Sequence, residues 1–457
     1  MPDLPPASPL IENKADMIEV LSLGCKPKAD WRIGTEHEKF VFYKNNHKPV
    51  PYEGENGIRA LLEATMAANN WTPLLDEGAL IGLKDPVGGG AISLEPGGQF
   101  ELSGATLETV HQTCAETADH LNLLKSIADP MGIGFLGLGV APTWTLDEIG
   151  AMPKSRYSIM APYMEKVGTL GTSMMFRSCT VQVNLDFADE ADMVKKMRVS
   201  LALQPVATAL FANSPFLEGK PNGYLSFRSH IWRNLDDDRT GMLPFVFEEG
   251  MGFERYVDYA LDVPMYFVMR NGKYINCAGE SFRTFLEGKL PQLPGEKPTI
   301  SDWEDHITTI FPEVRLKQFL EMRGADSGAW ADICALPAFW VGLLYERSAL
   351  DAAWDLVKDW SAEERQSLRN EVPKSAIHTE FRSGTLNDIA REVLAISAAG
   401  LKARNRLNWE GADESQFLAP LNHIVETGKT SAERLLDRYH GDWAGDVTPL
   451  FCETMIN

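Results

Sequence analysis

The chain changes character near Trp330, and this change constrains the fold more than any other feature of the sequence. Before it, segments that alternate between polar and apolar residues predict strands. These segments are 31–43, 91–104 (a hairpin), 179–187, 224–232, 265–277 (a hairpin) and 314–323. After it, almost every segment has helical spacing, at 330–346, 349–358, 362–370, 386–404, 414–426 and 432–439. Strands followed by helices indicate an α+β fold, with an antiparallel sheet and helices packed on one side.

Helices are also predicted among the strands, at 14–23, 56–69, 106–131 and 191–213. The glycine-rich segment 132–139 follows a helix and does not open one, so we interpret it as a closely packed strand. Residues 1–14 are predicted to form a loose N-terminal arm. Residues 15–457 then form a single domain, with a sheet-bearing part to about residue 329 and a helical part over 330–457.

Charge and composition exclude several functional classes. Lys and Arg number 43 against 64 Asp and Glu, a net charge of −21, which argues against binding to nucleic acid or to an anionic membrane. No apolar stretch approaches the roughly 20 residues of a membrane span, and no signal peptide is evident. The six cysteines are widely separated and form no CxxC pair, so we expect buried thiols and no zinc ribbon. We therefore expect a cytosolic protein.

Two acidic motifs predict a site for a hard cation. Glu36 and Glu38 lie two residues apart on a predicted strand and so share one face. Glu95 and Glu101 flank a Pro-Gly-Gly turn that allows them to converge. Paired carboxylates of this kind suit Mg²⁺ or Mn²⁺. The alternative for either motif alone is a solvated strand face.

The strand 179–187 places amides beside these acids. One of its faces carries polar residues: Thr180, Gln182, Asn184 and Asp186. The other face is apolar and is expected to pack on core helices. The oxygens of Gln182 and Asn184 can bind a hard cation or orient a substrate ammonium group.

Two further segments supply arginines. Arg228 shares a face of segment 224–232 with Ser226 and His230, and Arg323 shares one of segment 314–323 with Glu321. Arginine grips carboxylate or phosphate with two parallel hydrogen bonds, although an Arg beside an acid is most often a plain salt bridge. Neither the P-loop motif nor GxGxxG is present. Acids, amides and arginines on one sheet face therefore indicate ATP-dependent chemistry on an anionic substrate.

Four segments together resemble plant-type glutamate–cysteine ligase, a family of plants and many proteobacteria. They are 34–40 (GTEHEKF), 94–104 (LEPGGQFELSG), 180–187 (TVQVNLDF) and 321–326 (EMRGAD). The likeness runs from about residue 12 to the end of the chain. It implies a glutamine-synthetase-like fold, with a curved, mainly antiparallel sheet and helices outside. It also implies that ATP phosphorylates the γ-carboxylate of L-glutamate and that the amino group of L-cysteine attacks the γ-glutamyl phosphate, the first step of glutathione biosynthesis.

The same resemblance implies roles for single residues. The expected magnesium ligands, with Mn²⁺ as an alternative metal, are Glu36, Glu38, Glu95, Glu101, Glu321 and Gln182, the last replacing a histidine of bacterial relatives. Arg228 is expected to bind the glutamate carboxylate and Arg323 to steady the transferred phosphoryl group. The remaining substrate-binding residues are expected to be Met175, Cys179 and Asn184.

Redox control and assembly are also inferred from the resemblance. Cys114 and Cys334 match one of the two redox-sensitive cysteine pairs of the plant enzymes. Cys277 matches half of the other pair, whose partner position is Gln292 here. We expect at most one disulfide switch, and a monomer or homodimer.

Three alternatives compete with this interpretation. The nearest is a ligase of the same fold that joins another amino acid or amine. A non-catalytic amino-acid-binding protein should have lost some of the five glutamates, and all five are present. A metal-dependent hydrolase could use the acidic cluster, but it would give no reason for the two predicted strands that carry Arg228 and Arg323.

Overall fold

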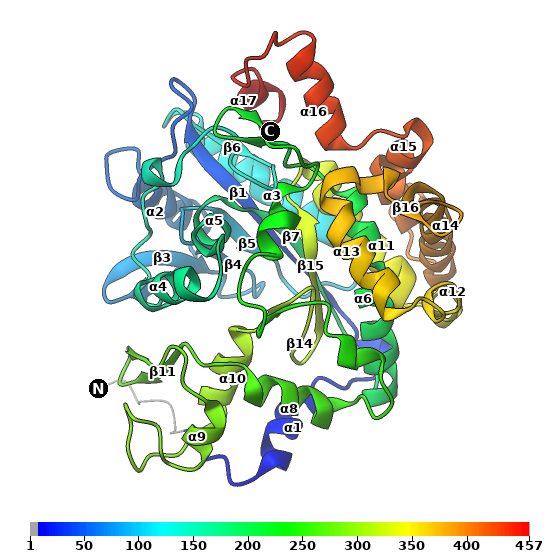
Figure 1. Cartoon of the computed structure of the whole chain (residues 1–457). Coiled ribbons are helices and arrows are strands. Elements are labelled where there is room, and N and C mark those ends of the chain that lie inside the picture. Colours follow the sequence, from blue (N-terminus) through cyan, green and yellow to red (C-terminus); the bar gives the residue numbers. More distant parts are fainter. Residues whose placement is uncertain (1–7, 457) are drawn as a thin grey trace.

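A nine-stranded sheet forms the centre of the computed structural model, which describes residues 8–456 (Figure 1). Its strands lie in the order β14 (Val314–Leu316), β15 (Leu320–Asp326), β7 (Thr180–Leu185), β1 (Ile33–Tyr43), β5 (Phe100–Ser103), β4 (Ala91–Leu94), β3 (Ala79–Lys84) and β2 (Thr72–Asp76), while β6 (Ile133–Leu136) pairs with β1. Every pairing in this sheet is antiparallel. The predicted α+β fold with a mainly antiparallel sheet is confirmed.

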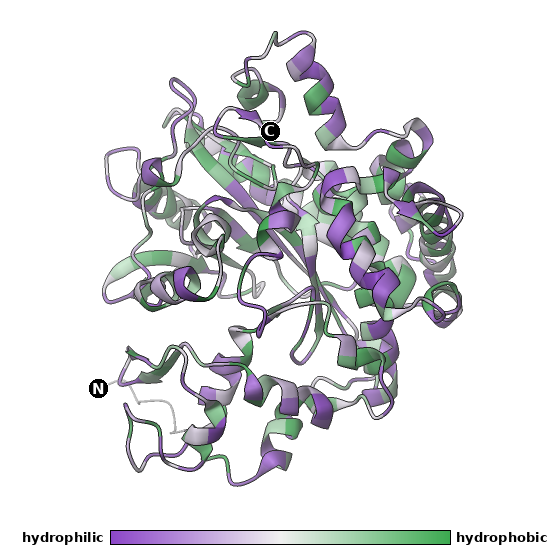
Figure 2. Ribbon diagram, viewed as in Figure 1, coloured by the Kyte–Doolittle hydropathy of each residue, from purple (hydrophilic) through white to green (hydrophobic). Residues whose placement is uncertain are grey.

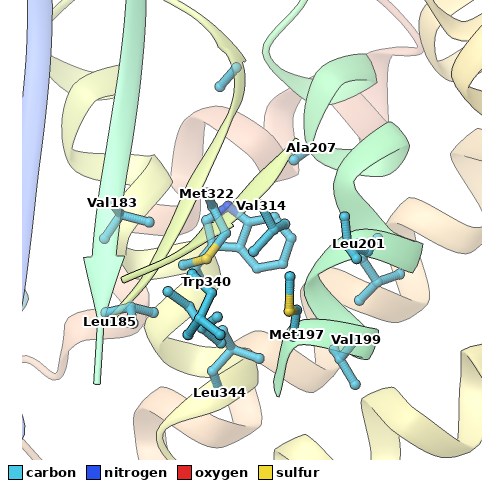
Figure 3. Close-up of a cluster of buried hydrophobic side chains, with 14 of the residues drawn as sticks. Val183, Leu185, Met197, Val199, Leu201, Ala207, Val314, Met322, Trp340 and Leu344 are labelled. Atoms are coloured by element: carbon cyan, nitrogen blue, oxygen red, sulfur yellow. The ribbon is translucent and has the colours of Figure 1, made fainter. Parts of the chain in front are cut away.

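One face of the sheet is covered by α3 (Val110–Ala128), α6 (Glu190–Leu210) and α11 (Trp330–Leu344). Figure 3 shows the core between the sheet, α6 and α11, where Leu185 of β7 and Met322 of β15 lie close to Trp340 of α11. Helix α11 is apolar around nearly its whole circumference, as expected of a helix surrounded by protein. Because side chains alternate along a strand, Glu36 and Glu38 of β1 and Gln182 of β7 point to the opposite face. His37 of β1 points towards α3, where its ring contacts His120.

The other helices surround this core. They are α1 (Lys14–Ser22), α2 (Ile58–Asn69), α4 (Tyr157–Val167), α5 (Gly171–Arg177), α7 (Phe227–Trp232), α8 (Phe253–Asp262), α9 (Phe282–Leu286), α10 (Ile300–Thr308), α12 (Arg347–Val357), α13 (Ala362–Ser375), α14 (Leu386–Arg404), α15 (Ala419–Thr427), α16 (Ser431–His440) and α17 (Leu450–Glu453). The largely hydrophilic α13 lies on the outside (Figure 2). The predicted helices before and after Trp330 are confirmed, with ends that differ by a few residues.

Short strand pairs complete the fold. They are β8 (Phe216–Leu217) with β9 (Lys220–Pro221), β10 (Thr240–Gly241) with β13 (Phe311–Pro312), β11 (Phe267–Arg270) with β12 (Lys273–Asn276), and β16 (Glu380–Phe381) with β17 (Gly384–Thr385). The predicted hairpin over 265–277 is confirmed. Asn271 and Gly272 both have positive φ angles, 52° and 74°, as a type I′ turn requires.

Two predicted strands are wrong. Segment 224–232 contains α7, because the Ser226 hydroxyl caps a helix by accepting a hydrogen bond from the Ser229 amide at 3.2 Å. Segment 314–323 is a hairpin of β14 and β15, closed by the amide of Lys317 donating to the carbonyl of Phe319 at 2.9 Å. Periodicity detected the strand-like ends of this segment but not its reversal.

The N-terminal arm is not loose where the structure describes it. Ile11 is 3% exposed, and its amide donates to the carbonyl of Pro298 at 3.0 Å. Burial of this side chain, together with backbone hydrogen bonds such as that from the Ile300 amide to the carbonyl of Pro9 at 2.9 Å, holds the segment in place. Residues 1–7 of the predicted arm lie outside the described residues.

Within the described residues, no single helix is long and apolar enough to cross a membrane; α11 and α12 pass that test only together, bent by 89°.

Cys114 on α3 and Cys334 on α11 are buried free thiols. Burial, followed by a hydrogen bond with the Cys334 thiol, raises the pKa of Cys114 far above its usual range. Because the two thiols are in hydrogen-bond contact, we predict that an oxidant joins the two sulfurs, although slowly, since burial disfavours the reactive thiolate. Mass spectrometry of the oxidised protein should then show a Cys114–Cys334 linked peptide with Cys277 free, and a pair that stays reduced would refute the prediction.

Candidate active site

The polar face of the sheet lines a cavity of about 260 Å³. Four acids and four arginines lie on its wall: Glu36, Glu38, Glu95, Glu101, Arg156, Arg228, Arg315 and Arg323. Apolar side chains complete the wall, among them Tyr157, Met160, Met174, Met175, Trp232, Phe267 and Phe311. The cavity therefore combines opposite charges with an apolar surface, as sites for small polar ligands do.

Sheet register brings the acids together. On β1, Glu38 lies opposite Glu101 of β5, and Glu36 lies opposite Gln182 of β7. Glu95 is in the turn between β4 and β5, the turn predicted from the sequence. This turn needs its glycine at position 97, because a Cβ there would lie 2.2 Å from the carbonyl oxygen of Phe176.

These carboxylates repel one another. Burial, followed by the charges of Glu321 and Glu101, raises the pKa of Glu36 to about 7. Burial and the charges of Glu95 and Glu101 raise the pKa of Glu38 well above its usual range, and the pKa of Glu101 is also raised, mainly by burial. A bound cation would relieve this repulsion.

Glu321 lies apart from the other four glutamates. Its side chain is fully buried, and it is not on the cavity wall. Arg315 donates to both of its oxygens at 2.7–2.9 Å, and Arg323 donates to Oε1. Burial alone would raise the pKa of Glu321, but Arg315, Arg323 and Lys317 hold it well below its usual range.

A buried hydrogen-bond network positions Arg228. The Asp326 carboxylate on β15 accepts from the hydroxyls of Ser214 and Ser226 at 2.6 and 2.8 Å, which ties the start of α7 to the sheet. Arg228 Nη2 then donates to the carbonyl of Arg323 at 3.1 Å. The Arg228 side chain therefore lies on the cavity wall although it belongs to a helix and not, as predicted, to a strand.

The structure places the other predicted residues as follows. Met175 and Gln182 line the cavity. Asn184 lies behind the wall and donates to Glu36 Oε1 at 2.8 Å. Cys179 is completely buried, with 0% of its surface exposed, and packs in an apolar cluster. Its side chain follows the apolar face of the strand and does not line the cavity, so nothing in this geometry supports the predicted substrate contact.

Sequence reasoning missed several cavity residues, among them Arg156, Arg315 and Trp232. Arg315 faces Glu321 only because segment 314–323 reverses direction. Arg156 lies at the start of α4, outside any predicted strand, and Trp232 lies at the end of α7, in a segment predicted as a strand from which only Arg228 was expected at the site. One pattern in the sequence could have drawn attention to Arg315. Arg315 and Lys317 are two residues apart, as Glu321 and Arg323 are, so each pair would share one face of a strand.

The residues present fit a divalent cation. Within the described residues, no three acidic, His or Cys side chains are close enough to hold a metal alone. Mg²⁺, however, commonly takes one or two carboxylates and completes its shell with water and substrate phosphates. Glu36, Glu38, Glu95, Glu101 and Gln182 offer only oxygen ligands of this kind around one cavity.

Comparison with known proteins identifies the family. The sequence model of glutamate–cysteine ligase family 2 (GCS2) matches residues 32–453. The chain belongs to this family. It is 57% identical over 443 residues to glutamate–cysteine ligase B, chloroplastic, of Oryza sativa subsp. japonica, covering 97% of this chain and 87% of that protein. It is 57% identical over 443 residues to the chloroplastic glutamate–cysteine ligase of Arabidopsis thaliana, covering 97% and 83%.

A solved structure shares the fold of this family member. It is the glutamate–cysteine ligase of Francisella tularensis in complex with AMP, with a TM-score of 0.55 and 11% sequence identity. The match covers 93% of this chain and 87% of that chain. At this identity the likeness supports the α+β fold alone.

The relatives also correct the predicted compartment. They are named chloroplastic, which contradicts the expectation of a cytosolic protein. That expectation rested on composition and on the lack of secretory features. A folded, acidic enzyme of ordinary composition suits any aqueous compartment, so these features could not identify one.

Proposed function

We propose that this member of the glutamate–cysteine ligase family joins L-cysteine to the γ-carboxylate of L-glutamate, with ATP converted to ADP and phosphate. The observation that carries the proposal is the cavity in which four glutamates face four arginines, in a chain 57% identical to glutamate–cysteine ligases over nearly its whole length. The product would be γ-glutamylcysteine, the first intermediate of glutathione biosynthesis.

Arg228 and the glutamates of the cavity have distinct roles in this proposal. Arg228 binds a carboxylate of glutamate with two parallel hydrogen bonds. Glu36, Glu38, Glu95 and Glu101 hold Mg²⁺, with Gln182 as an amide ligand; Glu321 is the sixth predicted ligand. The metal, when bound, offsets the charge of the ATP phosphates beside an acidic wall. Without that positive charge, the carboxylates would repel both anionic substrates.

The buried arginines complete the site. Arg323, on β15, steadies the transferred phosphoryl group as negative charge develops on its oxygens. The apolar wall, which includes Met175 and Phe267, excludes water from the γ-glutamyl phosphate. No side chain is assigned as a general base, because the carboxylates of the cavity are assigned to the metal.

The test is phosphate release from ATP by the purified protein with Mg²⁺. We expect release with glutamate and cysteine together, and γ-glutamylcysteine in equal amount by mass spectrometry. Release with another amine in place of cysteine, but not with cysteine, would favour a ligase of different specificity. No release with any amino acid would refute the proposal.

Replacing Arg228 by Lys is expected to raise the KM for glutamate about tenfold or more and to change the KM for ATP little. Lys keeps the charge but cannot form two parallel hydrogen bonds to one carboxylate. Steady-state kinetics measure both constants. Arg233→Lys is the matched control, because Arg233 follows the same helix, donates to the carbonyl of Asn370 at 2.6 Å and does not line the cavity. An unchanged KM for glutamate in Arg228→Lys would remove Arg228 from the substrate site.

A further inference from the structure

Helix α13 belongs to the helical part of the chain but packs on α7, the helix that carries Arg228. The carbonyl of Pro373, near the end of α13, accepts hydrogen bonds from the amides of Leu225 and Ser226 at 2.8 and 3.0 Å, directly before α7 begins. Of α13, which the structure describes completely, no residue lines the cavity of the candidate active site. The helix therefore reaches the site from behind its wall.

One ion pair joins α13 to the chain between β13 and β14. Arg369 Nε donates to Glu313 Oε1 at 2.9 Å, and each side chain is 11% exposed. The backbone of Glu313 is held as well: its amide donates to the carbonyl of Gly241 at 3.0 Å, and its carbonyl accepts from the amide of Arg323 at 3.2 Å. Among the described residues, Arg369 is the one hydrogen-bond partner of the Glu313 carboxylate. Arg369 is therefore the group that compensates its charge.

A small cavity of about 10 Å³ lies between this ion pair and the wall of the large cavity, with room for about one water molecule. Arg228 and Trp232 line both cavities, whereas Glu313 and Arg369 line the small one and not the large one. The Nε atom of Arg228 is buried and has no partner among the described residues. Arg228 thus has the large cavity on one side and Glu313 on the other, close enough for the two charges to attract each other.

We propose that Arg369 is a positioning residue: by neutralising Glu313, it leaves the Arg228 guanidinium free to bind the substrate carboxylate in the large cavity. The inference rests on the proposed function, which assigns Arg228 to glutamate. It gives the helical part of the chain a role in substrate binding, although α13 does not line the large cavity.

The mechanism is a competition between two carboxylates for one arginine. Without Arg369, the mostly buried Glu313 carboxylate lacks a partner, and a buried charge without a partner is costly. Attraction between Glu313 and Arg228 then draws the guanidinium towards the small cavity. Asp326 and Glu38 also lie near Arg228, but both already accept hydrogen bonds from neighbouring hydroxyl or amide groups. The substrate carboxylate must therefore compete with Glu313, and it binds more weakly.

The test measures the Kd of L-glutamate for the full chain by isothermal titration calorimetry with Mg²⁺ present. Arg369→Met should raise this Kd about tenfold, roughly the value of one charge-assisted hydrogen bond. Adding Glu313→Gln to Arg369→Met should restore binding almost to that of the unchanged protein, because the competing charge is gone. Arg369→Lys should bind glutamate almost normally, because Lys keeps a positive charge beside Glu313. Arg382→Met is the control, because Arg382 forms its ion pair with Glu364 of α13 and does not line either cavity.

Rescue by the second substitution separates this role from a structural one. A merely structural ion pair is absent from the double variant too, so a double variant that binds as weakly as Arg369→Met would overturn the inference, as would an unchanged Kd in Arg369→Met. Circular dichroism checks folding, and Arg369→Gln replaces Arg369→Met with the same expectation if the latter does not fold. Phosphate release by the unchanged protein tests the proposed function separately. Turnover without the predicted order of Kd values would refute this inference alone, and the predicted order without turnover would refute the proposed function alone.

Discussion

Replacing Glu36 by Gln is expected to lower kcat by roughly 10²- to 10³-fold, the loss typical when one preorganised charge contact in a transition state is removed. Gln has nearly the same shape but lacks the negative charge that holds a metal ion. The fold should not suffer, because the buried Glu36 carboxylate is repelled by Glu321 and Glu101 in the metal-free chain. We therefore expect an unfolding midpoint at or above that of the unchanged protein.

Two measurements test this expectation. Phosphate release gives kcat, and thermal unfolding followed by circular dichroism gives the midpoint. Glu63→Gln is the control, since Glu63 forms an exposed ion pair with Arg59 on α2 and does not line the cavity. Normal turnover by Glu36→Gln would remove Glu36 from the metal site, whereas a lowered midpoint would indicate a structural role.

Replacing Asp326 by Ala is expected to reduce the free energy of unfolding by about 3–5 kcal/mol, the usual cost of removing one member of a buried charged network. Asp326 is 1% exposed and accepts hydrogen bonds from the hydroxyls of Ser214 and Ser226 and from the amide of Asn213. Without it, these three donors lose their acceptor, and the buried Arg228 guanidinium loses a nearby negative charge. Activity should fall as well, because the same network positions α7.

Urea denaturation measures the change in unfolding free energy. Asp437→Ala is the matched control, because Asp437 forms an exposed ion pair with Lys429 and should contribute less than about 1 kcal/mol. A loss below about 1 kcal/mol for Asp326→Ala would show that the network does not hold the start of α7. A stable variant with an unchanged KM for glutamate would separate Asp326 from the placement of Arg228.

The sequence predicted those parts of the site that a single strand determines. Glu36 and Glu38 share a face because they are two residues apart on β1, and this holds whatever the rest of the fold is. The turn that holds Glu95 was predicted from its glycines. Strand alternation likewise separated the polar face of β7, with Gln182, from the apolar face that buries Val183.

The parts that failed depend on partners distant in sequence. Segment 224–232 alternates like a strand, but Ser226 caps a helix there, and the Ser226 hydroxyl is held by Asp326, a hundred residues away. Arg315 joins the site only because the chain turns back after it, so that it lies opposite Glu321. No local pattern encodes such a contact, because periodicity reports which face a residue occupies and not which strand lies beside it.

The position of α11 in the chain has a consequence for synthesis on the ribosome. Val183 and Leu185 of β7 and Met322 of β15 belong to the same buried cluster as Trp340 and Leu344, which are translated last of these residues. Until α11 has left the exit tunnel, part of the apolar face of the sheet has no cover. Nascent chains that expose such surfaces are prone to aggregate. A chain cut short just before α11 should therefore be found with chaperones or in the insoluble fraction, despite carrying every cavity-lining residue described above.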